Sequence, residues 1–348
     1  MIDISDKKIF ENYLMETGLV SENDDFDFQY LEGGVSCVVA LVKAQGNYFI
    51  VKQALRKLNV KEDWTCDPGR MAVEMKSNEV YYRLVPDNAP KVVSYDEKNN
   101  IFIREAAPES CRMWKSDLMG GMLDFKVASS VIKTLVTVHN RCAGDEQIAK
   151  DFSDKEMFYK LRIDAYFEFS LKSNPTLTQY AKPIIDELMN SGITLVHGDY
   201  SPKNVMLDEK KVFITDYEVS HYGHPCFDIG FLSNHLILKS IHMREFGGAF
   251  LSMLQYVLDI YFDEMNFMPK DELETSFVRV LPLLMIARVD GKSPVEYIVD
   301  PNVKEFVRKA AYAIVDEKIT NRESLLKLLN KLVVGGYYED KRNRYNNV

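Results

Sequence analysis

The sequence predicts an α+β protein of two lobes, with an antiparallel sheet and one helix in the first lobe and mostly helices in a larger second lobe. Over roughly the first 105 residues, short runs rich in Val, Ile, Tyr and Phe are separated by turns that contain Gly or Asn. After Pro108 the apolar residues recur at helical spacing. Because the pattern changes near residues 105–110, we expect the lobes to cover 1–107 and 108–348.

The first lobe begins with a predicted helix within residues 1–20, whose apolar residues share one face. A second helix is expected over 68–84, where Pro68 suits the first turn. The predicted strands cover 28–31, 35–42, 48–53, 92–95 and 101–104.

The second lobe contains helices separated by short polar segments. Two short strands, 205–206 and 213–214, are expected to form a hairpin around the turn at 208–210. The predicted helices cover 127–142, 154–170, 176–191, 226–240, 247–264, 271–289, 302–317 and 322–333.

Composition and charge exclude several classes of protein. The chain of 348 residues is 46% hydrophobic, and no apolar run approaches the ~20 residues of a membrane helix, so we expect no membrane span. A net charge of −9 disfavours nucleic acid as a partner. The polar N-terminus does not resemble a secretory signal, and five scattered cysteines favour reduced thiols in the cytoplasm.

The segment most informative about function reads HGDYSPKN, from His197 to Asn204, and a DYE triplet follows from Asp216. Kinase-like phosphoryl transfer needs residues in this order: a carboxylate at the substrate hydroxyl, then an amide and a carboxylate for Mg²⁺. Asp199 fits the first role, and Asn204 and Asp216 fit the second. The alternative is a loop with a chance HGD and an exposed DYE, but the complete ordered set is more specific than either part.

The first lobe supplies candidate residues for binding the nucleotide. Gly33 and Gly34 lie between two predicted strands, where backbone N–H groups can approach phosphate, although most such pairs are plain turns. Lys52 lies on the third strand, the usual place for a lysine that binds phosphates. Glu74 on the following helix is its expected partner, and Glu79 is the competing candidate.

Three further positions have expected roles around these groups. After the last strand, the backbone of Glu105 or Ala107 is where adenine would form hydrogen bonds. His197 is expected to brace its loop rather than to act as a base. Asp228 either accepts backbone N–H groups of that loop or caps a helix, and the sequence does not separate these two readings.

Taken together, these motifs resemble the aminoglycoside phosphotransferase and choline kinase superfamily, and within it the 5-methylthioribose kinases. The resemblance implies a protein-kinase-like two-lobe fold and the use of ATP and Mg²⁺. It also implies that Glu218 is a second carboxylate near the metal and that Arg288 contacts the acceptor. Val289 stands where those kinases have a second arginine. The other reading of Arg288 is a cation at a helix end that pairs with Asp290 or with the carbonyls of the last turn.

The expected activity is therefore ATP- and Mg²⁺-dependent phosphorylation of a small-molecule hydroxyl, on a sugar or an aminoalcohol. An aminoglycoside O-phosphotransferase is the alternative enzyme, and it would need carboxylates clustered on the C-terminal helices. A kinase-like binding module without turnover is the alternative from another class. A protein kinase is disfavoured, because no activation-loop segment with an APE-type ending follows Asp216.

Overall fold

The computed structural model describes residues 2–21, 23–31, 36–57, 65–106, 110–208 and 211–335. The chain forms two compact units. The first comprises Met1–Arg112 and the returning segment Met206–Val219, and the second comprises Met113–Val205 and Ser220–Val348. Residues 107–109, where the sequence predicts the lobe boundary, lie outside the described residues.

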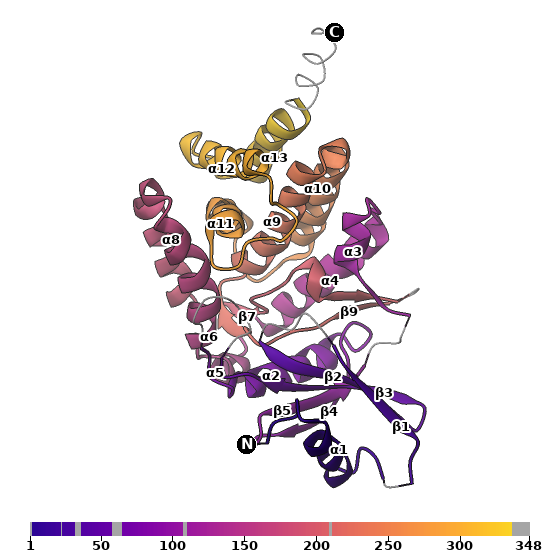
Figure 1. Ribbon diagram of the computed structural model, residues 1–348. Coiled ribbons are helices and arrows are strands. Elements are labelled where there is room, and N and C mark those ends of the chain that lie inside the picture. Colours follow the sequence, from indigo (N-terminus) through magenta and orange to yellow (C-terminus); the bar gives the residue numbers. More distant parts are fainter. Residues whose placement is uncertain are drawn as a thin grey trace, which may run out of the picture. The chain divides into compact units, whose positions relative to one another are not determined.

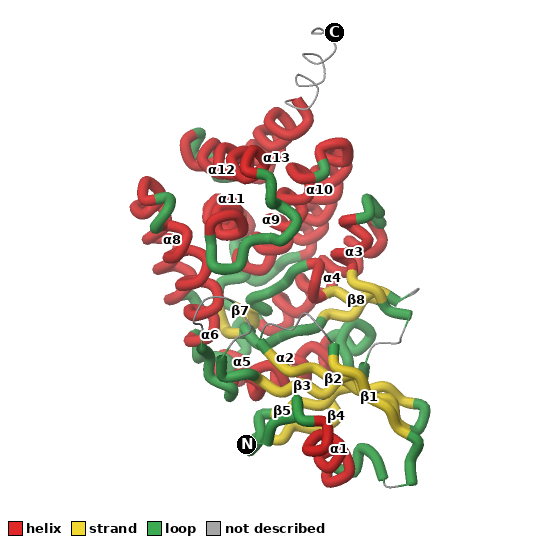
Figure 2. Tube along the Cα trace, in the orientation of Figure 1, coloured by secondary structure: helices red, strands yellow, loops and turns green. Residues whose placement is uncertain are grey.

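A five-stranded antiparallel sheet forms the centre of the first unit, with the strand order β1-β2-β3-β5-β4 (Figures 1 and 2). Gln45 and Gly46 both have positive φ between β2 and β3, as a two-residue hairpin turn of type I′ requires. The strands are β1 (Phe26–Tyr30), β2 (Cys37–Ala44), β3 (Asn47–Ala54), β4 (Val92–Asp96) and β5 (Ile101–Glu105).

Helices cover both faces of this sheet. α1 (Lys7–Glu16) packs on the face that carries Val51, and α2 (Arg70–Leu84) packs on the face that carries Phe102. Side chains alternate along a strand, so Lys52 in β3 points to the α2 face. The alternation thus places a charged residue of a buried strand opposite a helix.

The returning segment of the first unit carries the predicted hairpin. Its strands β8 (Val205–Leu207) and β9 (Val212–Ile214) are neighbours in a small sheet, and Asp208 N donates to Lys211 O at 2.9 Å across the turn. Asn88 anchors β9, because its side-chain amide donates to Val212 O and its carbonyl accepts from Ile214 N, both at 2.8 Å.

The second unit is mostly helical, with one two-stranded antiparallel sheet of β7 (Thr194–Val196) and β10 (His221–Gly223). Its α-helices are α3 (Trp114–Met119), α4 (Phe125–Cys142), α5 (Glu146–Asp151), α6 (Glu156–Phe158), α7 (Phe169–Leu171), α8 (Thr178–Asn190), α9 (Cys226–His242), α10 (Gly247–Glu264), α11 (Lys270–Asp290), α12 (Pro301–Asp316) and α13 (Arg322–Asn330). The shorter elements are β6 (Arg112–Met113), the π-helical η1 (Tyr159–Glu168) and η5 (Lys331–Gly335), and the 3₁₀ turns η2 (Pro175–Leu177), η3 (Pro202–Asn204) and η4 (Arg244–Phe246).

Helix α9 forms the core of this unit. It is buried along nearly its whole length, because α10 and α11 pack against it (Figure 1). A helix that is apolar on all sides is expected in such a position. Polar residues that α9 does carry, such as Asp228, His235 and Lys239, are therefore held inside the unit.

The structure departs from the predicted elements in two instructive places. Helix α2 begins at Arg70 rather than at Pro68, because the Asp67 carboxylate accepts the Gly69 N–H at 3.0 Å and forms a turn ahead of the helix. The helix predicted over 154–170 contains the π-helical η1, which is hidden in a segment rich in aromatic and apolar residues. No helix in the described part of the chain has the length and apolar character to cross a membrane.

Candidate active site

In the first unit, Lys52 lies between two carboxylates. Its Nζ is 2.6 Å from Glu74 Oε1 and 3.0 Å from Asp216 Oδ1. Lys52 is 6% exposed and Glu74 1%. The predicted pairing of Lys52 with Glu74 is thus present, whereas Glu79 is exposed on another side of α2.

Electrostatics favour the charged form of Lys52. Burial alone would lower the pKa of its ammonium, but the charges of Asp216 and Glu74 outweigh burial and hold the pKa well above its usual value. The lysine is therefore a permanent cation with a fixed position. Such a group suits the binding of a polyanion such as a nucleotide phosphate.

The backbone of Asp216 has an unusual conformation. It lies two residues beyond the end of β9 and has a φ of 72°, in the left-handed region that few residues other than glycine occupy. The next residue, Tyr217, is buried against Tyr81, and its hydroxyl donates to Ile214 O at 2.7 Å. This anchor holds Asp216 in its strained conformation and presents its partly exposed carboxylate.

Glu218, the third residue of the DYE triplet, is held by Arg70. The Nε of Arg70 donates to Glu218 Oε2 at 2.9 Å. The same guanidinium donates to the carbonyls of Leu55 at 3.0 Å and Asp67 at 2.9 Å. Arg70 therefore ties the DYE segment to the start of α2 and to the end of β3, a role that sequence reasoning did not assign.

The other predicted nucleotide-binding positions involve backbone. Gly33, Gly34 and Ala107 lie outside the described residues. The N–H of Glu105 donates to Lys91 O at 2.8 Å, so it is used within the sheet. The carbonyl of Glu105 accepts from Arg104 Nη1 at 3.0 Å. A carbonyl oxygen has two lone pairs, so the second one is the group that this residue offers to a base.

In the second unit, Asp199 lies on the loop between β7 and η3. Its Oδ2 is 2.8 Å from Lys203 Nζ and 3.2 Å from Arg162 Nη2. Arg162, from η1, also donates from Nε to Gly198 O at 2.7 Å, so one guanidinium holds both the loop backbone and the carboxylate. Sequence reasoning did not identify Arg162, and it assigned no role to Lys203.

The carboxylate of Asp228 holds the backbone of this loop in place. Its Oδ2 accepts from His197 N at 2.7 Å, and its Oδ1 accepts from Gly198 N at 2.9 Å. The alternative of a helix cap does not hold, because Asp228 lies in the first turn of α9 and Pro225 is at the cap. The predicted bracing role of His197 agrees with its burial, and Asp199 N donates to His197 Nδ1 at 3.2 Å.

A buried network supports Asp228 in turn. His139 Nε2 lies 3.3 Å from Asp228 Oδ2, and His139 Nδ1 lies 2.7 Å from the hydroxyl of Tyr261. Burial raises the pKa of Asp228, but the hydrogen bonds and the charge of His139 outweigh burial and bring the pKa below its usual value. Asp228 is therefore ionised and accepts two backbone N–H groups.

Asn204 closes the loop that begins at His197. Its side-chain amide donates from Nδ2 to Asp199 O at 2.9 Å, and the residue is buried. This bond spans the same five-residue interval that the sequence motif marks. The amide is thus oriented by the residue predicted to act on the acceptor.

Arg288 lies in the last turn of α11 and is 8% exposed. Its Nη1 donates to the hydroxyl of Tyr166 at 3.0 Å and to the carbonyl of Ser293. The reading of Arg288 as a partner of Asp290 does not hold, because Asp290 pairs with Arg308 at 2.7 Å.

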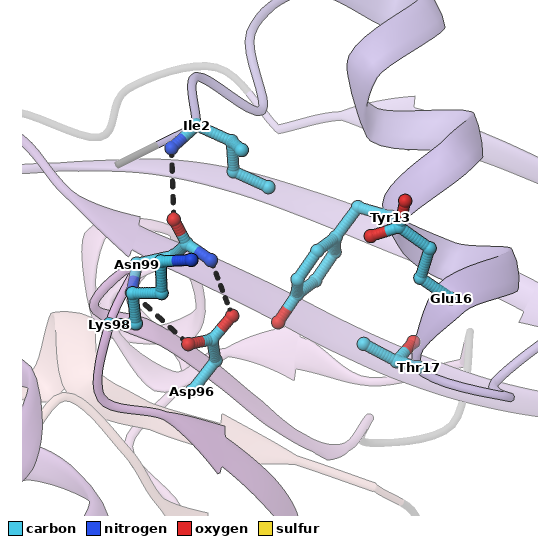
Figure 3. A pocket seen from close by; sticks show the side chains of 7 residues that line it. All are labelled: Ile2, Tyr13, Glu16, Thr17, Asp96, Lys98 and Asn99. Atoms are coloured by element: carbon cyan, nitrogen blue, oxygen red, sulfur yellow. Dashed lines mark hydrogen bonds between the residues drawn. The ribbon is translucent and has the colours of Figure 1, made fainter.

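The described residues contain no second centre of this kind. No group of three or more His, Cys, Asp or Glu side chains there could hold a metal ion. A hollow of about 450 Å³ lies beside α1 and the turn between β4 and β5 (Figure 3). It contains none of the predicted site residues, and Asn99 in its wall is already bonded to Ile2 N at 2.9 Å and Asp96 Oδ2 at 2.7 Å.

Part of the chain matches a known protein family. Residues 156–259 match the model of the phosphotransferase enzyme family, and this stretch includes Asp199, Asn204, Asp216 and Asp228. This part of the chain is similar to that family. The resemblance to aminoglycoside phosphotransferases and choline kinases predicted from the sequence is thereby confirmed.

One curated relative and two solved structures extend the likeness. Over 227 residues the chain is 24% identical to a methylthioribose kinase of Bacillus cereus (strain G9842), in an alignment that covers 56% of each protein. The chain thus spans about half the length of that relative.

The solved structures show the fold. An ethanolamine kinase of Plasmodium vivax superposes with a TM-score of 0.58 over 90% of each chain, at 15% identity. The amicoumacin kinase hAmiN, solved in complex with AMP-PNP and Ca²⁺, has a TM-score of 0.54 at 14% identity, over 89% of this chain and 94% of its own. These likenesses confirm the predicted α+β, kinase-like fold.

Proposed function

We propose that the protein is an ATP- and Mg²⁺-dependent kinase that phosphorylates a hydroxyl group of a small molecule, a sugar or an aminoalcohol. The observation that carries this proposal is the fixed Lys52 ammonium between Glu74 and Asp216. A buried lysine held by two carboxylates is the arrangement that kinase-like enzymes use to position nucleotide phosphates. The phosphotransferase-family stretch at 156–259 supports the same function.

Asp216 in the first unit and Asn204 in the second each carry an oxygen donor of a type that Mg²⁺ binds. Mg²⁺ takes few protein ligands, and these are carboxylate and amide oxygens. The strained backbone of Asp216 presents a partly exposed carboxylate, and Asn204 supplies an amide. When bound, the metal would neutralise phosphate charge. Glu218, with one oxygen bound by Arg70, would then act mainly by holding the segment around Asp216.

The residues of the second unit would handle the acceptor. Asp199 would orient the acceptor hydroxyl and accept its proton. The cations of Arg162 and Lys203 hold this carboxylate in one place, so little reorganisation is needed during the reaction. Asp228 keeps the loop backbone rigid beneath it.

The aminoglycoside alternative receives no support from the residues around Arg288. A polycationic acceptor would need carboxylates clustered on the C-terminal helices. Arg288 has the cation of Lys239 in its surroundings, and the carboxylate of Glu296, which also lies there, is already paired with Lys115. The excess of cations would repel such an acceptor. The ammonium group of an aminoalcohol would meet the same repulsion more weakly, so we favour a sugar and keep aminoalcohols and aminoglycosides in the test as comparisons.

The test is acceptor-dependent ADP release with a panel of sugars, aminoalcohols and aminoglycosides. We expect at least one sugar or aminoalcohol to be phosphorylated by the wild type and not by Asp199→Asn. Mass spectrometry identifies the phosphorylated product. A binding module without turnover would bind ATP but release no ADP with any acceptor, and that outcome would overturn the proposal.

A further inference from the structure

The second unit contains a buried lysine without a counter-ion. Lys239 on α9 is 1% exposed. Among the described residues, no hydrogen bond or ion pair involves its ammonium. The ammonium lies over the ring of Tyr297, with Nζ 5.1 Å from the centre of the ring. Lysine is almost never fully buried unless it is paired, because burial of an uncompensated charge is costly. A group of this kind indicates a position prepared for a negative ligand.

Two neighbouring groups also have unused hydrogen-bonding atoms. Within the described part of the chain, the Nε of Arg288 and the hydroxyl of Tyr297 are buried and have no partner. The charge of Arg288 acts on both Lys239 and Tyr297, so the three side chains lie in one neighbourhood. Together they offer three hydrogen-bond donors.

The charges around these donors are mostly positive. Lys115 on α3 and Arg288 on α11 both act on Lys239, and Glu296 is the carboxylate that opposes them. Glu296 is itself paired with Lys115. A local excess of cations inside a chain with a net charge of −9 is not a feature of general solubility.

Direct contacts connect this cluster to Asp199. Arg288 Nη1 donates to the hydroxyl of Tyr166, and the guanidinium of Arg162 lies 5.2 Å from the centre of the same ring. Arg162 in turn pairs with Asp199 at 3.2 Å. We call Lys115, Lys239, Arg288 and Tyr297 the basic cluster. Only the side chains of Tyr166 and Arg162 lie between this cluster and the predicted catalytic carboxylate of Asp199.

We propose that the acceptor of this kinase carries an oxyanion, a phosphate ester or a carboxylate, and that the basic cluster binds this group while the hydroxyl to be phosphorylated meets Asp199. The cluster would neutralise the charge of the ligand. The oxyanion would accept hydrogen bonds from the three donors and would supply the missing counter-ion for Lys239. The assignment of the bound anion as the phosphoryl acceptor rests on the proposed kinase function. The binding of an anion by the basic cluster does not.

The anion site is tested directly by binding of inorganic phosphate, measured as the shift in melting temperature with phosphate concentration. We expect phosphate to stabilise the wild type, and Lys239→Met and Lys115→Gln to weaken its apparent affinity by roughly tenfold or more. Lys182→Met, which removes an exposed lysine of α8, is the matched control and should behave as the wild type. Equal phosphate affinity in the wild type and in Lys239→Met would overturn the proposal.

The acceptor class is tested by turnover with matched compounds: a free hexose, the hexose monophosphate and the corresponding aldonic acid. We expect one of the two anionic compounds to have the higher kcat/KM, and Lys239→Met to raise its KM roughly ten- to a hundredfold. The phosphate and the acid separate the two sources of an oxyanion. An active kinase that prefers the neutral hexose would overturn the proposal and leave the kinase function standing. Phosphate binding that depends on Lys239 in a protein without turnover would support the anion site and refute the kinase function.

Discussion

The Nζ of Lys203 lies 2.8 Å from Oδ2 of Asp199, the residue four positions earlier on the same loop. Arg162 approaches that same oxygen from η1, at 3.2 Å. Two cations thus hold one buried carboxylate oxygen in place. Because the positions of both cations depend on the charge of Asp199, a substitution there changes the chemistry and the local electrostatics together.

Asp199→Asn should lower kcat by about 10²–10⁴-fold, because the amide cannot accept the hydroxyl proton and binds neither cation strongly. Nucleotide affinity should change little, since the nucleotide phosphates are expected at Lys52. Steady-state ADP release gives kcat, and calorimetric titration with AMP-PNP gives the affinity. A variant that keeps more than about a tenth of the wild-type kcat would show that Asp199 is not the base.

Glu74→Gln should raise the KM for ATP roughly tenfold and destabilise the protein by about 1–3 kcal/mol, because it leaves the buried Lys52 with one carboxylate instead of two. The matched control is Glu79→Gln on the same helix, whose side chain is exposed. Kinetics at varied ATP and urea denaturation measure the two effects. Equal behaviour of the two variants would remove the positioning role assigned to Glu74.

The sequence predicts a contact correctly where the local pattern around each partner already assigns that partner to a strand or a helix. The alternating pattern of 48–53 indicates a strand and the spacing over 68–84 indicates a helix, so a lysine on the strand and a glutamate on the helix could be paired before the structure was known. The HGD loop and the DYE triplet were found because their chemistry requires a fixed order within a short segment.

The residues that were missed depend on packing between distant segments. Arg162 reaches Asp199 only because η1 lies beside the loop, and a π-helix leaves no mark in the apolar spacing. Lys239 reads as an ordinary polar position on a helix, and only the packing of α10 and α11 on α9 buries it. Burial of a charge is a property of the tertiary structure, so the sequence does not reveal it.

Asp216→Asn should raise the Mg²⁺ concentration needed for half-maximal activity by at least roughly tenfold, because a charged oxygen ligand is replaced by a neutral one. Asparagine tolerates positive φ, so the strained backbone at this position should be kept. Glu218→Gln should have the smaller effect, since Arg70 binds one of its oxygens. Titration of Mg²⁺ during turnover compares the two variants, and a larger effect of Glu218→Gln would reverse their assigned roles.

Asp228→Asn should destabilise the loop that carries Asp199. One side-chain oxygen becomes an amide that cannot accept the N–H of His197 or Gly198, and a buried N–H without an acceptor costs about 1–3 kcal/mol. We expect a lower melting temperature and faster hydrogen exchange at these two amides, together with a lower kcat. Unchanged exchange at both amides would show that the loop does not depend on Asp228.

The stability of the folded protein should depend on pH through Lys239. Burial and the charge of Lys115 lower the pKa of Lys239 from 10.5 to about 7, against the opposing charge of Glu296. The charge of Arg288 on α11 adds to this effect. His242, on α9 like the lysine itself, also interacts with Lys239. The unfolded chain therefore binds one more proton than the folded chain between about pH 7 and pH 10.5, so this residue makes the fold more stable as the pH rises through that window.

Lys239→Met removes the titrating group and keeps the length of the side chain. We expect the variant to be more stable than the wild type by about 3–5 kcal/mol at pH 6, where the lysine is charged in both states, and the difference to narrow steadily up to about pH 10.5. Urea denaturation of both proteins across this range measures the difference, and Lys182→Met controls for the loss of a charge at an exposed site. A difference that stays constant with pH, or a variant less stable than the wild type at pH 6, would show that Lys239 is not held as an uncompensated buried cation. Inorganic phosphate added at pH 6 should reduce the difference, because an anion that pairs with Lys239 stabilises only the protein that retains the lysine.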